Sequence, residues 1–303
     1  MTRLLQVVWG LGPLAFGWLV LDVSRAAPGG QLGIRAIAAE TLIFAAWSGG
    51  LVAVIRLRPT YLVYVRVASG SAAAWGGAGV AGGFEAGAIT LGWGLITLIL
   101  SFSPQVTIEA AARDSAPRER RFPLALPAGL LVFMVVPSAL VAGTGIGFIP
   151  AWLLGARPTG PRLLLTVIAL VASPVIVVSL SRLARRWLVV VPSGIVLHDP
   201  MLLAETYRLT PDEIAWVEFA PEKWRRVAIG EKVADATAGC ATRPLIIVLG
   251  KPMPGPMLRP RRSNGSGVVD MIACRPVNRT DALATLRSAG YERPSVEEGA
   301  VNG

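Results

Sequence analysis

A series of long apolar segments occupies the first 181 residues and limits what this chain can fold into. A helix needs about 20 mostly apolar residues to cross the hydrocarbon core of a bilayer. Segments that approach this length lie at 4–21, 37–55, 67–84, 86–102, 122–141 and 163–181. An arginine-rich stretch at 182–186 ends the series, and alternating runs, turn prolines and most of the charge follow. We therefore predict a membrane α-helical bundle of six transmembrane helices over 1–182, followed by a soluble domain.

The composition supports a membrane protein. Hydrophobic residues make up 53% of the chain and charged residues 16%, whereas soluble domains are about 25% charged. The formal net charge is +10. A basic excess suits either nucleic acid or an anionic membrane surface. The apolar segments favour the membrane, and no basic stripe with interleaved aromatic residues indicates nucleic-acid binding.

The third segment, 67–84, decides the topology because its alanines and glycines make it the least apolar. If it crosses, both termini, loop 56–66 and loop 103–121 share one side. That side then holds most of the flanking arginines: Arg3, Arg56, Arg58, Arg66, Arg113, Arg118, Arg120, Arg121, Arg182, Arg185 and Arg186. The opposite side holds Arg25, Arg35, Arg157 and Arg162. The positive-inside rule then predicts a multi-pass protein of the cell membrane with both termini in the cytoplasm. Five crossings would weaken this bias.

The C-terminal part reads as a mainly-β domain over 187–293. Strand-like runs occur at 187–192, 195–198, 205–209, 214–219, 245–249, 257–258 and 268–273. A helix is expected at 279–289, with Asn278 as its N-cap, Gly290 at its end, and Leu283 and Leu286 facing inward. Short strands closed by one helix are the order of a pleckstrin-homology-like (PH-like) barrel. The tail, 294–303, is expected to be disordered.

Four stretches carry a resemblance to a known family. They are ERRFP at 119–123, RRWLVVVPSGIVLHDP at 185–200, DATAG at 235–239 and RPVNRTDAL at 275–283. In this order they resemble segments of an uncharacterised family of actinobacterial multi-pass membrane proteins with a C-terminal soluble domain. The resemblance covers nearly the whole chain and implies no activity.

One carboxylate is a candidate for a role inside the membrane. Glu40 lies four residues into the second segment. An ionisable residue within a span is costly and is a functional-site hypothesis by default. Glu40 could carry a proton or bind a cation in a transporter or channel-like protein. It could also be an interfacial carboxylate that reaches water.

Two loops of the soluble domain are candidates for binding anionic lipid headgroups or an acidic protein partner. The residues expected to carry this binding are Arg225, Arg226, Arg259, Arg261 and Arg262. Each basic side chain held near an anionic leaflet contributes about 1 kcal/mol. Ordinary solvated loop charge is the alternative.

The remaining motifs argue against catalysis. His198 and Asp199 lie near Ser193, but no nucleophile-elbow sequence accompanies them. The glycine-rich stretch 143–147 ends an apolar segment rather than following a strand, so it reads as a membrane-exit turn. Cys240 and Cys274 lack metal-ligand spacing, and we predict no metal or cofactor.

Gly79, Gly83 and Gly87 have the spacing of close helix contacts, which suits packing within the bundle or helix–helix self-association. We expect a non-enzymatic scaffold or accessory subunit whose cytoplasmic domain binds a protein partner or headgroups. A transporter using Glu40 is the alternative.

Overall fold

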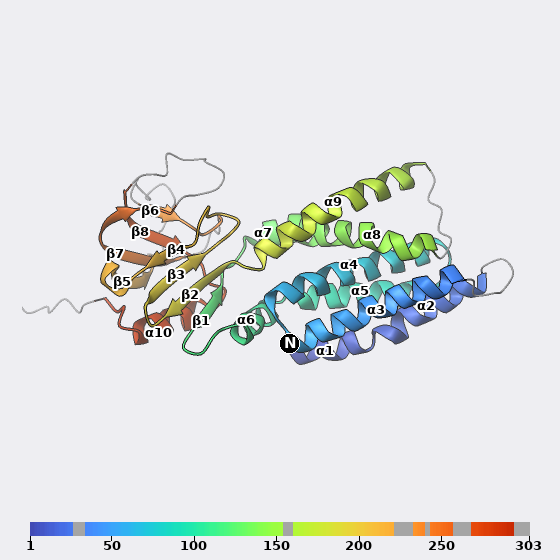
Figure 1. The fold of residues 1–303 in the computed structure, drawn as a ribbon, viewed down its shortest axis with the longest axis horizontal. Helices are drawn as coiled ribbons and strands as arrows, with labels where there is room; N and C mark the ends of the chain where they lie inside the picture. The colour runs from blue at the N-terminus through green and yellow to red at the C-terminus, as the bar shows by residue number, and fades with distance from the viewer. Residues whose placement is uncertain (27–33, 154–159, 221–232, 240–242, 257–267, 294–303) are drawn as a thin grey trace, which may run out of the picture. The chain divides into compact units, whose positions relative to one another are not determined.

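A computed structural model describes residues 1–26, 34–153, 160–220, 233–239, 243–256 and 268–293 (Figure 1). The chain divides into two compact units. The helical unit comprises Met1–Asp114 and Gly129–Ala184, and the β unit comprises Ser115–Ala128 and Arg185–Gly303. The chain therefore passes between the units three times.

Helices build the first unit. In chain order they are α1 (Thr2–Gly10), α2 (Gly12–Ala26), α3 (Ile34–Arg56), α4 (Pro59–Ala81), α5 (Glu85–Ser101), α6 (Pro104–Arg113), α7 (Ala128–Leu130), the π-helix η1 (Leu131–Val135), α8 (Val136–Leu153) and α9 (Pro161–Leu183). Pro59 and Pro161 each occupy the first turn of a helix, where a missing N–H costs nothing.

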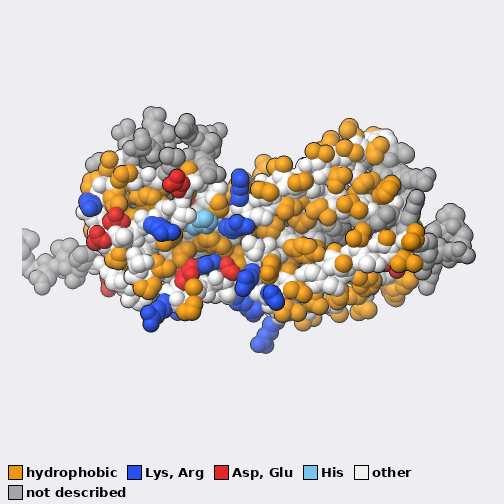
Figure 2. Space-filling view, in the orientation of Figure 1, with side chains coloured by type: hydrophobic (Ala, Val, Ile, Leu, Met, Phe, Trp, Pro, Cys, Tyr) orange, Lys and Arg blue, Asp and Glu red, His pale blue; other side chains and the backbone are white. Residues whose placement is uncertain are grey.

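The helical unit is suited to a membrane. Within the described residues, four stretches are long and apolar enough to cross one: Thr2–Asp22, Ile37–Arg56, Ala128–Ile149 and Leu163–Leu183. A fifth results if α5 and α6, which meet at a 61° bend, are one broken span. Hydrophobic side chains cover most of the visible face of these helices (Figure 2). These features indicate a membrane protein with four to five such helices, and the sixth expected span stays a prediction.

The remaining expected span falls in α4, which has 23 residues but is rich in alanine and glycine. The helices α4 and α5 pack closely through their glycines. A Cβ added at Gly87 would lie 2.7 Å from the carbonyl carbon of Gly79. Gly83, at φ +80°, forms the turn between the two helices. Two of the three glycines considered for self-association are therefore used within the chain.

The described strands of the β unit form two four-stranded sheets. The first has the order β1 (Arg120–Pro123), β2 (Trp187–Val191), β3 (Gly194–His198) and β4 (Tyr207–Leu209), all antiparallel. The second has the order β5 (Ile214–Phe219), β7 (Leu245–Pro254), β8 (Val268–Cys274) and β6 (Val233–Asp235). Its β6–β8 pair is parallel. The short 3₁₀-helix η2 (Pro211–Glu213) connects the sheets. The described strands do not close into one barrel.

One hydrophobic core lies in the β unit and draws on both sheets and on α10 (Arg279–Ser288). The Asn278 side chain accepts a hydrogen bond from the N–H of Asp281, and Gly290 has a φ of +94°, as the predicted caps require. Leu283 and Leu286 are both buried in this core, which confirms their inward orientation. The run predicted at 257–258 and the tail at 294–303 lie outside the described residues.

The strand β1 differs from the expectation that a span covers 122–141. Phe122 and Pro123 belong to β1, and the helical segment begins only at Ala128. Arg120 pairs with Val190, and Pro123 pairs with Trp187. The apolar character of Phe122 thus serves the core of the β unit, where this side chain is buried.

Candidate functional site

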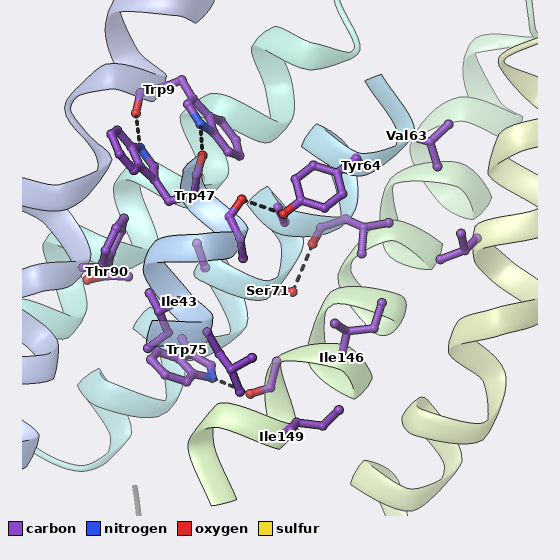
Figure 3. Close-up of a pocket in the computed structure, with 18 of the residues that line it drawn as sticks. Trp9, Ile43, Trp47, Val63, Tyr64, Ser71, Trp75, Thr90, Ile146 and Ile149 are labelled. Atoms are coloured by element: carbon purple, nitrogen blue, oxygen red, sulfur yellow. Dashed lines mark hydrogen bonds between the residues drawn. The ribbon is translucent and has the colours of Figure 1, made fainter. Parts of the chain in front are cut away.

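A cavity of about 480 Å³ lies within the helical unit (Figure 3). Its lining is mostly aromatic and aliphatic and comes from α1 to α5, α8 and α9: Trp9, Phe16, Leu42, Ile43, Ala46, Trp47, Thr60, Val63, Tyr64, Val67, Ala68, Ser71, Ala72, Trp75, Thr90, Trp93, Ile146, Gly147, Ile149, Val177 and Ser181. We call this space the aromatic cavity. Its volume is in the range of small-molecule sites, about 300–1,000 Å³.

The helix α4 supplies one complete face of the cavity. Its lining residues recur every three or four positions from Thr60 to Trp75, which is the spacing of one helix face. At 1.5 Å per residue, this face is about 22 Å long. It is therefore longer than one leaflet of a bilayer, which is about half of a hydrocarbon core of roughly 30 Å.

Each indole N–H in the lining is satisfied by a backbone carbonyl. Trp9 Nε1 donates to the Trp47 oxygen at 3.2 Å, and Trp47 Nε1 donates to the Trp9 oxygen at 2.9 Å. Trp93 Nε1 donates to the Val8 oxygen at 2.6 Å. Trp75 Nε1 donates to the Gly147 oxygen at 2.7 Å. The rings are therefore fixed, and the polar atom of each ring is already occupied.

The hydroxyl groups of Tyr64, Ser71 and Thr90 also donate to backbone carbonyls. Tyr64 donates to the Ala46 carbonyl at 2.6 Å, and Ser71 donates to the Gly143 carbonyl at 2.8 Å. Thr90 donates to the Ala15 carbonyl at 2.8 Å. A ligand inside the cavity therefore meets carbon surface and finds few free donors or acceptors, which suits an apolar ligand.

Glycines make room for the indole rings. A Cβ at Gly12 would lie 2.8 Å from side-chain atoms of both Trp47 and Trp93, and one at Gly50 would collide with the Trp9 ring. The Trp9 and Trp93 ring centroids lie 5.3 Å apart in a tilted arrangement. Aromatic pairs at such distances contribute about 0.5–1.5 kcal/mol beyond area burial. The aromatic wall is thus a packed part of the bundle.

The two ends of the cavity differ in chemistry. One end carries Thr60 and Tyr64 at the start of α4 and Ser181 at the end of α9, and we call it the hydroxyl end. The other end carries Trp75 from α4 with Gly147 and Ile149 from α8, and we call it the apolar end. Figure 3 shows Trp75 and Ile149 close together, away from Val63 and Tyr64.

Glu40 does not belong to this cavity. It lies in the second turn of α3 and is half-buried. Within the described residues, no three His, Cys, Asp or Glu side chains are grouped so that they could hold a metal ion. The five loop arginines predicted to bind headgroups or a partner, Arg225, Arg226, Arg259, Arg261 and Arg262, lie outside the described residues.

In the β unit, His198 and Asp199 have separate partners. His198 Nδ1 lies 2.8 Å from Thr206 Oγ1. Burial lowers the pKa of His198, although the adjacent Asp199 acts in the opposite direction. The Asp199 carboxylate instead binds Arg186 at 2.8 Å and accepts two backbone N–H bonds. This arrangement is structural. The glycine-rich stretch 143–147 lies inside α8 rather than in a turn, and packs against α4 and α9.

Comparison of the chain with protein-family models, with curated proteins and with solved structures finds no match. The function must therefore be argued from the site.

Sequence reasoning missed the aromatic cavity. Trp47, Trp75 and Trp93 lie well inside apolar segments, whereas membrane tryptophans are enriched at the interfaces. Small residues precede or follow each of them at helical spacing, such as Ala68, Ala72 and Gly50. That combination was a usable signal for aromatic rings turned inward.

Proposed function

We propose that this protein is a non-enzymatic integral membrane protein that binds the hydrocarbon chain of a membrane lipid in the aromatic cavity. One observation carries the proposal. The cavity lies among helices apolar enough to cross a membrane, and each tryptophan N–H in its lining already donates a hydrogen bond to a backbone carbonyl. A hydrocarbon chain requires no polar partner and fills such a space without leaving any donor unpaired.

The length of the cavity supports a chain rather than a compact ligand. The α4 face from Thr60 to Trp75 is about 22 Å long, and it presents small side chains between larger ones. An extended chain can lie against Ala68 and Ala72 while the aromatic rings hold it from the side. Binding would come from close van der Waals packing.

The finer architecture belongs to the same proposal. We take α4 as a crossing helix, which gives six spans with both termini in the cytoplasm. Its 23 residues measure about 34 Å, enough for a bilayer core. Gly70, Ala73, Gly76 and Gly79 are buried, so much of its small-residue surface meets other helices rather than lipid. The β unit is then a PH-like cytoplasmic unit of an accessory protein that binds a partner or headgroups.

Transport through Glu40 is not part of this proposal. Glu40 does not line the cavity, and no described feature connects it to a pathway. Self-association through Gly79, Gly83 and Gly87 is also left out, because Gly79 and Gly87 pack against each other.

Native mass spectrometry of the protein released from mild detergent tests chain binding. We expect lipid to remain bound to the wild type. Ala46→Phe places a ring in the cavity and should remove that lipid, because the volume is then occupied. Ala45→Phe is the matched control, since Ala45 is exposed on the same helix and does not line the cavity.

The two variants differ by one position, so a general effect of added bulk on folding would appear in both. Equal lipid retention by Ala46→Phe and the wild type would contradict the proposal. Loss of lipid from both variants would show that retention does not depend on the cavity, and would also contradict the proposal.

A further inference from the structure

The chain of a lipid cannot by itself make the cavity selective. A hydrocarbon chain moving from the bilayer into an apolar cavity exchanges one apolar surrounding for another, so no hydrophobic driving force discriminates between lipids. Selection must then come from the headgroup. The charge at the two ends of the cavity decides which headgroup is accepted.

Hydrogen bonds between helices fix which helix ends lie together. Ser71 of α4 donates to Gly143 of α8 at 2.8 Å, and Ser173 of α9 donates to Ala142 at 3.1 Å. Trp75 donates to Gly147, further along both α4 and α8. The first and third contacts show that α4 and α8 run parallel. Ser173 contacts Ala142 whereas Ala169 lies beside Gly145, so α9 runs antiparallel to α8. The end of α9 is therefore level with the start of α4.

Basic side chains flank the hydroxyl end as a result. Arg58 is the N-cap of α4, two residues before Thr60, and Arg182 follows Ser181 in the last turn of α9. Both arginines are exposed. Arg58 forms a long ion pair, in which its Nε lies 3.8 Å from Asp114 Oδ1. Arg182 forms no ion pair with another described residue. Two cations are thus available beside this end.

The apolar end carries charges of both signs. The lining there is Trp75, Gly147 and Ile149. Toward the corresponding helix ends lie Glu40 in the second turn of α3 and Glu85 at the start of α5, but also Arg35 in the first turn of α3 and Arg162 in the first turn of α9. Opposite charges offset each other there, whereas the two arginines attract a negative headgroup at the hydroxyl end.

We infer that the aromatic cavity accepts a lipid with an anionic headgroup, seated with its phosphate at the hydroxyl end beside Arg58 and Arg182. The inference rests on the proposed chain binding and adds the headgroup class and the orientation. The Thr60 hydroxyl, which has no acceptor among the described residues, is placed to bind a headgroup oxygen. The chain extends from there past Ala68 toward Trp75.

Tryptophan quenching by brominated lipids tests this in the full-length protein. The background is a variant with Trp18→Phe and Trp152→Phe, since both rings are exposed on the helical unit. Nanodiscs of zwitterionic lipid receive a small fraction of either brominated anionic lipid or brominated zwitterionic lipid with identical chains. We expect the anionic lipid to quench at a concentration lower by about thirtyfold, or fivefold for each arginine.

Arg58→Gln with Arg182→Gln should remove this preference, because it weakens binding of the anionic lipid far more than binding of the zwitterionic lipid. Arg3→Gln with Arg118→Gln is the control, because it removes the same charge from exposed positions that do not flank the cavity. High salt should weaken the preference only.

The outcomes separate the two proposals. Equal quenching by both lipids, abolished by Ala46→Phe, would overturn the anionic inference while chain binding stands. Quenching that Ala46→Phe leaves unchanged would contradict chain binding itself. A preference that survives in the Arg58→Gln, Arg182→Gln variant, or that the control variant also loses, would overturn the assignment of the headgroup to these two arginines.

Discussion

At the residue scale, the buried ion pair of Arg186 and Asp199 sets a strong constraint on the β unit. The side chains are 2% and 0% exposed. Asp199→Ala leaves the guanidinium buried without its counter-charge, which should lower the free energy of unfolding of the β unit by about 3–5 kcal/mol. Pulse proteolysis of the full-length protein in urea measures this change.

A double variant shows whether the cost comes from the unpaired charge. Arg186→Met with Asp199→Asn removes both charges but keeps an oxygen for the N–H groups of Met201 and Leu202. It should be clearly more stable than Asp199→Ala, since a buried pair can often be replaced by neutral groups at little cost. Equal stability of the two variants would show that the unpaired charge is not what lowers the free energy of unfolding.

At the scale of elements, a fragment of the β unit needs the strand β1 in order to fold. Leu124 N–H donates to the Arg186 carbonyl at 3.0 Å, and Ala125 N–H donates to the Arg275 carbonyl at 2.7 Å, so this segment contacts both sheets. A fragment of residues 187–293 exposes the edge of β2 and loses Phe122 from the core. We expect it to aggregate or remain partly unfolded.

Joining residues 115–128 to residue 185 by a short Gly/Ser linker should restore folding, because β1 and β2 are already paired. Size-exclusion chromatography and amide NMR spectra compare the two fragments. A well-dispersed spectrum from 187–293 alone would show that β1 is dispensable.

The strand β1 also separates what the sequence could predict in the β unit from what it could not. The hairpin of β2 and β3 was predictable because its signals are local: alternating apolar residues and a turn at Gly194, whose φ is +132°. The cap at Asn278 was local too. The pairing of β1 with β2 is not local, since two long apolar stretches, Ala128–Ile149 and Leu163–Leu183, intervene. Phe122 is also predicted to begin a span. The aromatic cavity required knowledge of which helix faces meet, which a hydropathy profile does not contain.

At the scale of the whole molecule, the β1–β2 pairing constrains the topology independently of charge. Pro123 and Trp187 are paired residues, so the number of membrane crossings between them must be even. The helices α8 and α9 are both apolar enough to cross, which would give two crossings. If α4 also crosses, the N-terminal part contributes four more, and both termini share the side of the β unit.

A pair of reporters tests this arrangement. A reporter that is active only outside the cytoplasm should stay silent when fused after Gly303 and when inserted after Ala116, which is exposed and precedes β1. It should be active when inserted after Gly83, in the turn before α5, because α5 separates Gly83 from Ala116. A reporter fused before Met1 then tests α4. It should be silent if α4 crosses, and activity there would show that α4 does not cross. The positive-inside bias would then arise from five spans, and the N-terminus would lie opposite the β unit.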